Sequence, residues 1–174
     1  MKSFRTTFRF KECDKGINHS SSVLTIGSCF SEVVGERLSL SKLDALVNPF
    51  GTVFNPDSIF NLLSNSLLSK PVNPDLYLNR HDNYFHYQLH SSFNAASKEE
   101  LANRIENSQV LVKNKLETAS HLVVTLGTAF VHRLKENDTV VTNCHKQPQQ
   151  YFSKSILGLN EMIECFNAFY QKLL

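Results

Sequence analysis

The sequence predicts an α/β fold with a mainly parallel sheet, in one domain that spans residues 1–174. Two short apolar segments, Val23–Gly27 and His121–Thr128, show no clean alternation, which is typical of strands buried on both faces of a parallel sheet. Helical patterns lie between these segments, and strands that alternate with helices are typical of the α/β class. A chain of 174 residues is long enough to bury a hydrophobic core.

Composition and charge exclude several classes of protein. The net charge is only +2 and no run of Lys or Arg forms a basic stripe, so we expect no nucleic-acid partner. No apolar run could span a bilayer and the start of the chain lacks the apolar core of a secretory signal, so we expect a cytoplasmic protein without a membrane partner. The four cysteines form no Cys-x-x-Cys pair, which indicates reduced thiols rather than a metal site. No cofactor is expected.

The N-terminal third also contains an earlier strand and a helix. Ser3–Phe10 places phenylalanines at even spacing, which favours a half-buried strand. Over Phe30–Leu40 apolar residues recur at helical spacing and predict an inward helix face that includes Phe30 and Val33. Gly35 within this helix costs about 1 kcal/mol relative to Ala, so we expect close packing at that position.

The middle of the chain predicts a loop, a helix and a hairpin. Asn48–Pro56 is a loop, because two Asn-Pro pairs bracket a glycine and residues before proline disfavour helix. A helix follows over Asp57–Leu68 and ends before Pro71. Asp75–Phe93 has the aromatic content of a β-hairpin with its turn at His-Asp-Asn.

The second half predicts two more helices and another hairpin. Ser97 and Glu100 form a capping box that opens the longest helix, Lys98–Thr118. Phe130–His145 predicts a hairpin that turns at Glu-Asn-Asp. The last helix, Leu159–Leu173, is expected to bury the apolar residues that recur at helical spacing: Leu159, Met162, Ile163, Phe166 and either Phe169 or Tyr170.

Both buried strands end in Gly followed by a hydroxyl residue, Ser28 after the first and Thr128 after the second. Ligands of parallel sheets bind beyond the carboxyl ends of the strands, so a site is expected there. Ser28 would lie at the start of a helix, where free N–H groups can hold an oxyanion while a base activates the hydroxyl. The alternative is that Ser28 only caps the helix.

Cys29 is the rival nucleophile, since a helix N-terminus activates thiols. A packing role is favoured for Cys29, because free cysteine is among the most often buried residues. A thiol enzyme is therefore the weaker of the two nucleophile hypotheses.

Several motifs resemble those of one protein family. The segment Ile26–Glu32, IGSCFSE, resembles the signature of the GSCFA family, with Ser31 where the family name has Ala. Further matches lie along most of the chain: FRT near the start, then NPFGTVFNP, HSSF, TLGTAFVHR and NCHKQP. The family is similar to the SGNH/GDSL hydrolases. The resemblance therefore implies a three-layer αβα sandwich and the chemistry of esterases or acyl hydrolases.

The resemblance also implies roles for the residues that match its motifs. Ser28 matches the serine nucleophile, and Gly51 matches the glycine whose amide lines the oxyanion hole. The third block of the SGNH pattern carries an asparagine donor, which this chain lacks at its Gly-Thr pair. Four residues are therefore considered as further oxyanion or substrate-binding groups: Gly127, Thr128, Asn48 and Asn143.

The chain lacks the segment that supplies the catalytic base in the SGNH pattern. Those enzymes take a histidine and its acid from a C-terminal Asp-x-x-His segment, and no such motif occurs in these 174 residues. The resemblance implies the N-terminal part of a longer domain whose C-terminal strands are missing, with an uncovered sheet edge that favours self-association. His145, within NCHK, is the first candidate for the base, and His90, within HSSF, is the second candidate and a substrate-binding group.

The sequence thus predicts a serine-dependent hydrolase or acyltransferase that acts on an ester or acetyl group of a small molecule, a carbohydrate or a cell-envelope component. The alternative is a non-catalytic ligand- or carbohydrate-binding module on the same fold. A third interpretation is a truncated product without activity. The chain alone is expected to be inactive, because the Asp-x-x-His base is absent from its sequence.

Overall fold

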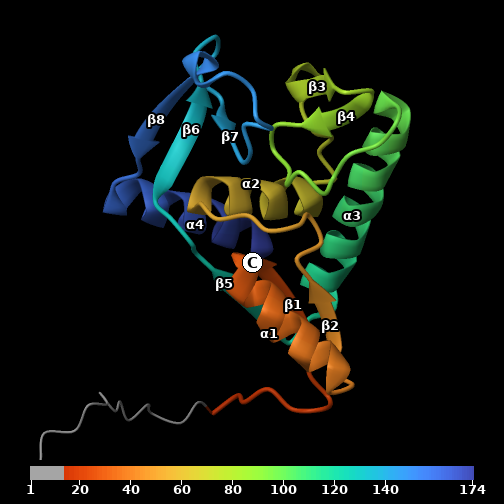
Figure 1. Cartoon of the computed structure of the whole chain (residues 1–174). Coiled ribbons are helices and arrows are strands. Elements are labelled where there is room, and N and C mark those ends of the chain that lie inside the picture. Colours follow the sequence, from red (N-terminus) through yellow and green to blue (C-terminus); the bar gives the residue numbers. More distant parts are fainter. Residues whose placement is uncertain (1–13) are drawn as a thin grey trace, which may run out of the picture.

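The computed structural model describes residues 14–174, so the strand predicted over Ser3–Phe10 lies outside the described residues. Figure 1 shows a parallel sheet with helices around it and two smaller antiparallel units beyond the end of that sheet. The helices are α1 (Cys29–Leu40), α2 (Pro56–Leu67), α3 (Lys98–Thr118) and α4 (Leu159–Leu173). The strands are β1 (Ser22–Gly27), β2 (Asp44–Val47), β3 (Tyr77–Arg80), β4 (Asn83–His86), β5 (His121–Thr125), β6 (Phe130–Leu134), β7 (Val140–Val141) and β8 (Phe152–Ile156).

The parallel sheet has the order β2-β1-β5, with β1 at its centre. Thr25 of β1 lies opposite Val47 of β2 and Val123 of β5, and Gly27 lies opposite Thr125. The hairpin β3-β4 and the sheet β7-β6-β8 are antiparallel. The predicted α/β fold with a parallel sheet is therefore confirmed.

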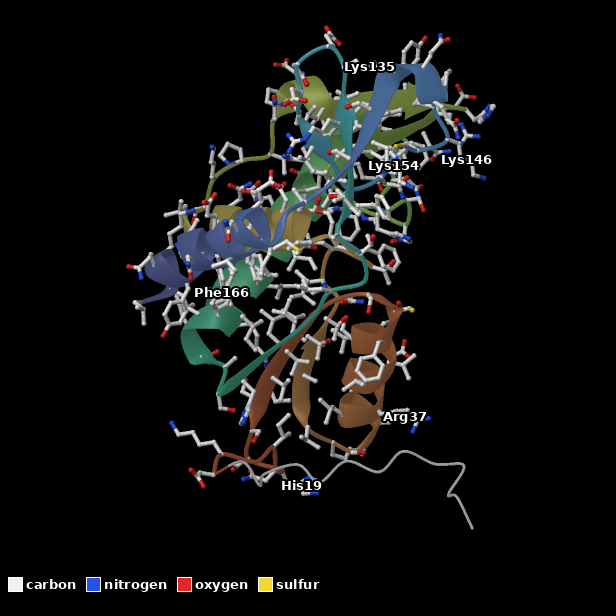
Figure 2. The ribbon with its side chains drawn as sticks, turned by 90° about the vertical axis from the view of Figure 1, so that its left-hand side faces the viewer. His19, Arg37, Lys135, Lys146, Lys154 and Phe166 are labelled. Carbon is white, nitrogen blue, oxygen red and sulfur yellow. The ribbon has the colours of Figure 1, made fainter. Side chains whose placement is uncertain are left out.

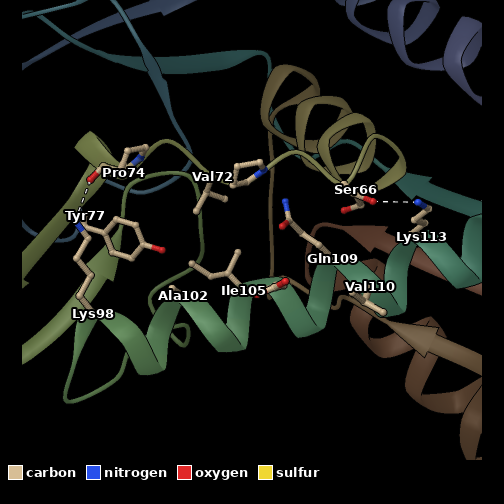
Figure 3. A pocket seen from close by; sticks show the side chains of 13 residues that line it. Ser66, Val72, Pro74, Tyr77, Lys98, Ala102, Ile105, Gln109, Val110 and Lys113 are labelled. Atoms are coloured by element: carbon tan, nitrogen blue, oxygen red, sulfur yellow. Dashed lines mark hydrogen bonds between the residues drawn. The ribbon is translucent and has the colours of Figure 1, made fainter.

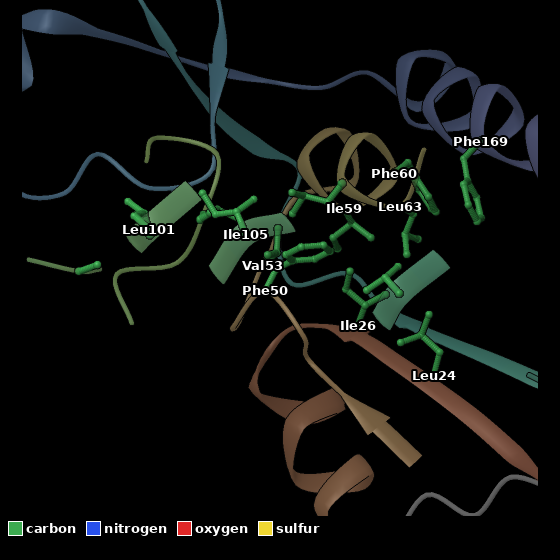
Figure 4. Packing of buried hydrophobic residues seen from close by; sticks show 14 residues of the cluster. Leu24, Ile26, Phe50, Val53, Ile59, Phe60, Leu63, Leu101, Ile105 and Phe169 are labelled. Atoms are coloured by element: carbon green, nitrogen blue, oxygen red, sulfur yellow. The ribbon is translucent and has the colours of Figure 1, made fainter. Parts of the chain in front are cut away.

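The two faces of β1 pack against different helices. Leu24 and Ile26 belong to the main hydrophobic core, which they share with residues of α2, α3 and α4 (Figure 4). Thr25 points to the other face, where its hydroxyl lies against Gly35 of α1. Successive side chains of a strand alternate between its two faces, so β1 is covered by helices on both sides.

Helix α1 packs on the sheet through small residues. A Cβ placed on Gly35 would lie 2.6 Å from Thr25 Oγ1, so the predicted close packing is confirmed, and Ser31 one turn earlier is also buried. The predicted apolar face is wrong, since 65% of Phe30 and 49% of Val33 are exposed. Val33 lies two positions from both Ser31 and Gly35, which places it about 200° around the helix and on the solvent side.

Helix α4 buries a narrower stripe than the sequence predicts. Phe169 is buried and stacks on Phe60 of α2, with ring centroids 5.8 Å apart. The other large apolar residues of the predicted stripe, Met162 aside, are exposed: Leu159, Ile163, Phe166 and Tyr170. The predicted burial of Phe169 is therefore confirmed. The expectation is wrong for these four residues, because α4 packs on α2 along a narrower line through Cys165 and Phe169.

Two strands were not predicted, because tertiary pairing rather than local pattern forms them. β2 is only four residues long and begins with exposed Asp44, and in β8 only Phe152 is buried. The hairpin turns are where the sequence predicts them: His81 and Asp82 both have positive φ between β3 and β4, and Asp138 does so between β6 and β7.

Basic side chains lie at both ends of the molecule. Figure 2 shows Lys135, Lys146 and Lys154 around the antiparallel units and Arg37 on α1 at the opposite end. Among the helices of residues 14–174, none is both long and apolar enough to cross a membrane.

The contact at Gly35 gives the first testable prediction. Gly35→Val inserts a branched side chain where even a Cβ would lie 2.7 Å from Val47 Cγ1, and we expect a loss of about 2–3 kcal/mol in the free energy of unfolding. The control is Ser39→Val, at an exposed position of the same helix, where the change should stay within about 0.5 kcal/mol. Urea unfolding followed by circular dichroism measures both. Equal losses in the two variants would show that α1 does not rest on Gly35.

Candidate functional site

The turn between β1 and α1 is built against strand β5. Gly27 has φ +136°, and a Cβ there would lie 2.1 Å from the carbonyl oxygen of Thr125, so a side chain is excluded. Ser28 follows as the N-cap of α1, and its N–H donates to Thr125 O at 3.1 Å and Thr125 Oγ1 at 3.0 Å. The carboxyl end of the central strand and the start of α1 are therefore held at one point.

The Ser28 hydroxyl pairs with another hydroxyl. Its Oγ lies 2.9 Å from Thr125 Oγ1 and accepts a hydrogen bond from Phe30 N at 3.3 Å. The side chain thus caps α1 and also lies at the strand end where a nucleophile is expected. Thr125 is a residue of the candidate site that the sequence analysis missed. The strand register identifies it, because β5 pairs Thr125, not Thr128, with the Gly-Ser end of β1.

Asn48 holds this turn from the other side. It is buried, and its φ of +38° turns the chain back after β2. Its Oδ1 accepts from Gly27 N and from the Ser31 hydroxyl, both at 3.0 Å, and its amide group approaches Ser28 O at 3.5 Å. Asn48 was considered as an oxyanion donor, but its carboxamide is directed at the protein's own backbone.

Gly51 and His90 lie against each other. Gly51 has φ +73°, and a Cβ there would lie 2.6 Å from His90 Cβ. The Gly51 N–H donates to Asn48 O at 2.7 Å, so the amide expected in the oxyanion hole already has an acceptor. His90 Nδ1 accepts from Ser92 N at 3.3 Å, which leaves the ring proton on Nε2.

Gly127 and Thr128 form the other wall beside Ser28. Both of their N–H groups donate to Phe54 O, at 2.8 and 3.1 Å, and Thr128 Oγ1 accepts from Phe130 N. A Cβ on Gly127 would lie 3.4 Å from Ser28 Cβ and 2.7 Å from Phe54 Cδ1. The Phe54 ring therefore already occupies the place that a side chain at Gly127 would need, and the absence of that side chain lets Phe54 and Gly127 pack close to Ser28.

His145 and Asn143 lie elsewhere, in the loop that follows β7. His145 is 3% exposed, its Nε2–H donates to His86 O at 2.9 Å, and its ring packs near Phe85 with centroids 5.1 Å apart. Asn143 Oδ1 accepts from His145 N at 2.8 Å. Burial lowers the pKa of His145, so the neutral ring is favoured. The contacts of this pair are with the β3-β4 hairpin and not with Ser28.

The predicted site residues thus fall into two groups. Ser28, Gly127 and Thr128 meet at the strand ends, together with Asn48 and Gly51. His90 contacts Gly51 and so lies beside the first group, whereas His145 and Asn143 form the second group against the β3-β4 hairpin.

His86, which the sequence analysis left as background, ends strand β4, and its carbonyl accepts the hydrogen bond from His145. It is fully buried, its Nε2–H donates to Asn73 O at 3.0 Å, and its Nδ1 accepts from Gln88 N at 3.2 Å. Burial lowers its pKa from 6.5 to about 4. The hairpin beneath His145 therefore requires a neutral His86.

The packing role predicted for Cys29 is wrong, because the residue is exposed. Cys29 lies two positions before Ser31, which faces the sheet, so it is turned about 200° away from the sheet. Its side chain therefore lies on the solvent side of the first turn of α1.

The model of the GSCFA family matches residues 22–174, which is most of the chain. The match runs from β1 to the end of α4 and includes every candidate residue named above. Neither a curated protein nor a solved structure matches the chain. The resemblance seen in the sequence motifs is thus confirmed at the level of the family.

Removal of the Asn48 carboxamide should destabilise the turn that carries Ser28. Asn48→Gly keeps the left-handed backbone but leaves the buried Gly27 N–H without its acceptor, and we expect a loss of about 2 kcal/mol in the free energy of unfolding. Lys42→Gly is the matched control, since Lys42 also has positive φ but is exposed. Urea unfolding is the measurement, and a neutral Asn48→Gly would contradict the assigned role.

Stability should fall in mild acid because of His86. The folded pKa of about 4 lies below the ordinary 6.5, so the contribution is complete above pH 6.5 and is lost as the pH falls toward 4. We expect the free energy of unfolding to drop by about 3 kcal/mol over that window. His86→Gln should flatten the pH profile, while His81→Asn, at the exposed hairpin turn, should not. A profile of wild-type steepness in His86→Gln would rule out this cause.

Proposed function

The chain belongs to the GSCFA family, and we propose that it is a serine-dependent hydrolase or acyltransferase of the SGNH/GDSL type. The observation that carries the proposal is the position of Ser28. Its hydroxyl lies at the carboxyl end of the central strand and at the N-terminus of α1, beside Gly127. Substrates of open α/β sheets bind at such strand ends.

In the proposed reaction, Ser28 Oγ attacks the carbonyl carbon of an ester or acetyl group. The Ser28 proton passes to a base, and the partial positive charge at the start of α1 stabilises the oxyanion. The Cys29 N–H can serve as a donor to the oxyanion, since helix geometry gives the first amides no intrahelical acceptor. Collapse of the tetrahedral intermediate expels the alcohol, which takes a proton back from the base, and leaves an acyl-serine that water or a second hydroxyl cleaves.

The contacts support His90 over His145 as the base. His90 packs on Gly51, and Gly51 donates to Asn48, which also holds the Ser28 turn. His145 is buried among the aromatic residues of the hairpin, and its Nε2–H is committed to His86 O. A shift of the loop that carries His90 would be needed to bring its ring to Ser28.

The exposed apolar residues near Ser28 favour an acyl group as the reacting part of the substrate. Phe54 is 41% exposed and contacts the position of Gly127, and Leu126 is 53% exposed. We propose a small-molecule or carbohydrate ester as the substrate. We further propose that the helices and sheet belong to an SGNH-type three-layer sandwich, in which the edge strands β2 and β5 provide a route to self-association.

A non-catalytic binding module is the second candidate, and one observation favours it. The amides predicted to bind an oxyanion already donate to protein carbonyls: Ser28 N to Thr125 O, Gly51 N to Asn48 O, and Gly127 N to Phe54 O. A strand end at which these three donors are internally satisfied can hold a ligand without activating it.

A fluorophosphonate probe tests the serine mechanism. We expect slow labelling of the protein at Ser28, identified by peptide mass spectrometry, and its loss in Ser28→Ala. Ester turnover should stay negligible, because the partners of Ser28 Oγ in the described part of the chain, Thr125 Oγ1 and Phe30 N, are not bases. Ser39→Ala, at an exposed serine of the same helix, should label like the unmodified chain.

The other outcomes separate the alternatives. Labelling that appears on Cys29 would identify a thiol enzyme. A folded protein that labels at neither residue would favour the binding module. Rapid ester hydrolysis that disappears with Ser28→Ala would show that a base already reaches the hydroxyl.

A further inference from the structure

A cavity of about 510 Å³ lies between α2, α3 and the start of β3, apart from the strand-end site. Its walls are the C-terminal turn of α2, the loop that follows it, Tyr77 and one face of α3 (Figure 3). None of its lining residues belongs to the Ser28 group or the His145 group. The volume falls within the roughly 300–1,000 Å³ that is typical of small-molecule pockets.

The middle of the cavity is apolar and its two ends are polar. Val72 and Ile105 approach the central space from opposite sides, while Tyr77 and Gln109 lie at its two ends (Figure 3). Aliphatic side chains on both sides of this space suit an apolar ring.

Gln109 presents a fixed acceptor to this space. It is 7% exposed, and its Nε2–H donates to Lys70 O at 3.0 Å. A carbonyl accepts only, so the carboxamide orientation is set and Oε1 faces away from Lys70. Within residues 14–174 no donor reaches Gln109 Oε1, so this acceptor is free to bind a donor group of a ligand.

Tyr77 is held in place at the other end. Its ring packs edge-on against His86 with centroids 4.7 Å apart, and Lys98 Nζ lies 4.8 Å from its centre. Its hydroxyl points into the cavity in Figure 3 and has no hydrogen-bond partner in the described part of the chain. The hydroxyl can therefore donate to or accept from a bound molecule.

The rim beside Gln109 carries a positive charge without a carboxylate partner. Lys113 Nζ donates to Ser69 Oγ at 3.0 Å, and the ion pairs of the described residues involve Lys115 and Arg133 instead. Since Ser69 accepts from the ammonium, its own proton is free to donate to an anion. Lys98 adds a second cation at the far end, against one exposed acidic lining residue, Glu106.

We propose that this cavity binds a small aromatic carboxylate whose ring carries an N–H group. The ring lies between Val72 and Ile105, its N–H donates to Gln109 Oε1, and the carboxylate pairs with Lys113 and Ser69. Gln109 and Lys113 are four residues apart on α3, so the two side chains lie on the same face of the helix, about one turn apart. A ring N–H and a carboxylate that are joined by one short side chain can reach both of them.

Indole-3-acetate is the probe, and tryptamine, which has the same ring with an amine in place of the acid, is the matched ligand. We expect indole-3-acetate to shift the amide proton–nitrogen signals of Val72, Tyr77 and Ile105 with a Kd below about 1 mM, and tryptamine to bind at least about tenfold more weakly.

Two variants test the two polar contacts. Gln109→Met keeps the side-chain length but removes the acceptor, and Lys113→Gln removes the charge; each should weaken indole-3-acetate about tenfold. In Lys113→Gln, tryptamine should bind as well as indole-3-acetate. Lys135→Gln, on the distant antiparallel sheet, is the control and should leave the affinity unchanged (Figure 2).

Thermal unfolding tests whether each variant is folded. If Gln109→Met does not fold, the result for Lys113→Gln alone decides the question. The proposal is overturned if indole-3-acetate shifts none of these signals up to about 10 mM. It is also overturned if the two ligands bind equally to the unmodified protein, or if Lys135→Gln weakens binding as much as Lys113→Gln.

Discussion

The carboxamide of Asn48 is the contact on which the candidate site depends. The buried side chain accepts hydrogen bonds from Gly27 N at the end of β1 and from the Ser31 hydroxyl in the first turn of α1. The backbone N–H of the same residue donates to Thr25 O. The same residue has left-handed φ, so it also redirects the chain from β2 into the loop that carries Gly51. The position of Ser28 and the approach of His90 to the sheet are therefore set by one residue.

Much of the framework could be predicted from the sequence because it follows from local pattern. The Ser97 side chain caps α3 by accepting from Glu100 N, and the predicted β1 and β5 pair in parallel. Strand β2 and the exposed faces of α1 and α4 could not be predicted, since they depend on which element packs where. Apolar periodicity indicates a helix, but small residues such as Gly35 decide which face lies on the sheet.

The residues of the candidate site could also be predicted only where a local pattern marks them. Ser28, Gly51 and Gly127 could be found because strand ends and glycines are visible in the sequence. Thr125 was missed because the two strand ends look alike as Gly-hydroxyl pairs, whereas the register sets Thr125 opposite Gly27. His145 was the preferred base by motif, yet its burial against Phe85 and Tyr87 follows from long-range packing of the hairpin.

The close packing of α1 and the chemistry at its start are linked. Because the helix rests on Ser31 and Gly35, it lies near enough to the sheet for Ser28 to bond Thr125 through both its N–H and its hydroxyl. The same rotation turns the larger side chains of the first turn outward, beside the strand end. Because Ser28 is itself only 9% exposed, the hydroxyl pair is weakly screened by water, and a base or a ligand that reached it would interact more strongly than at an ordinary helix cap. The small residues that made the helix hard to orient from sequence are thus the ones that position Ser28 at the candidate site.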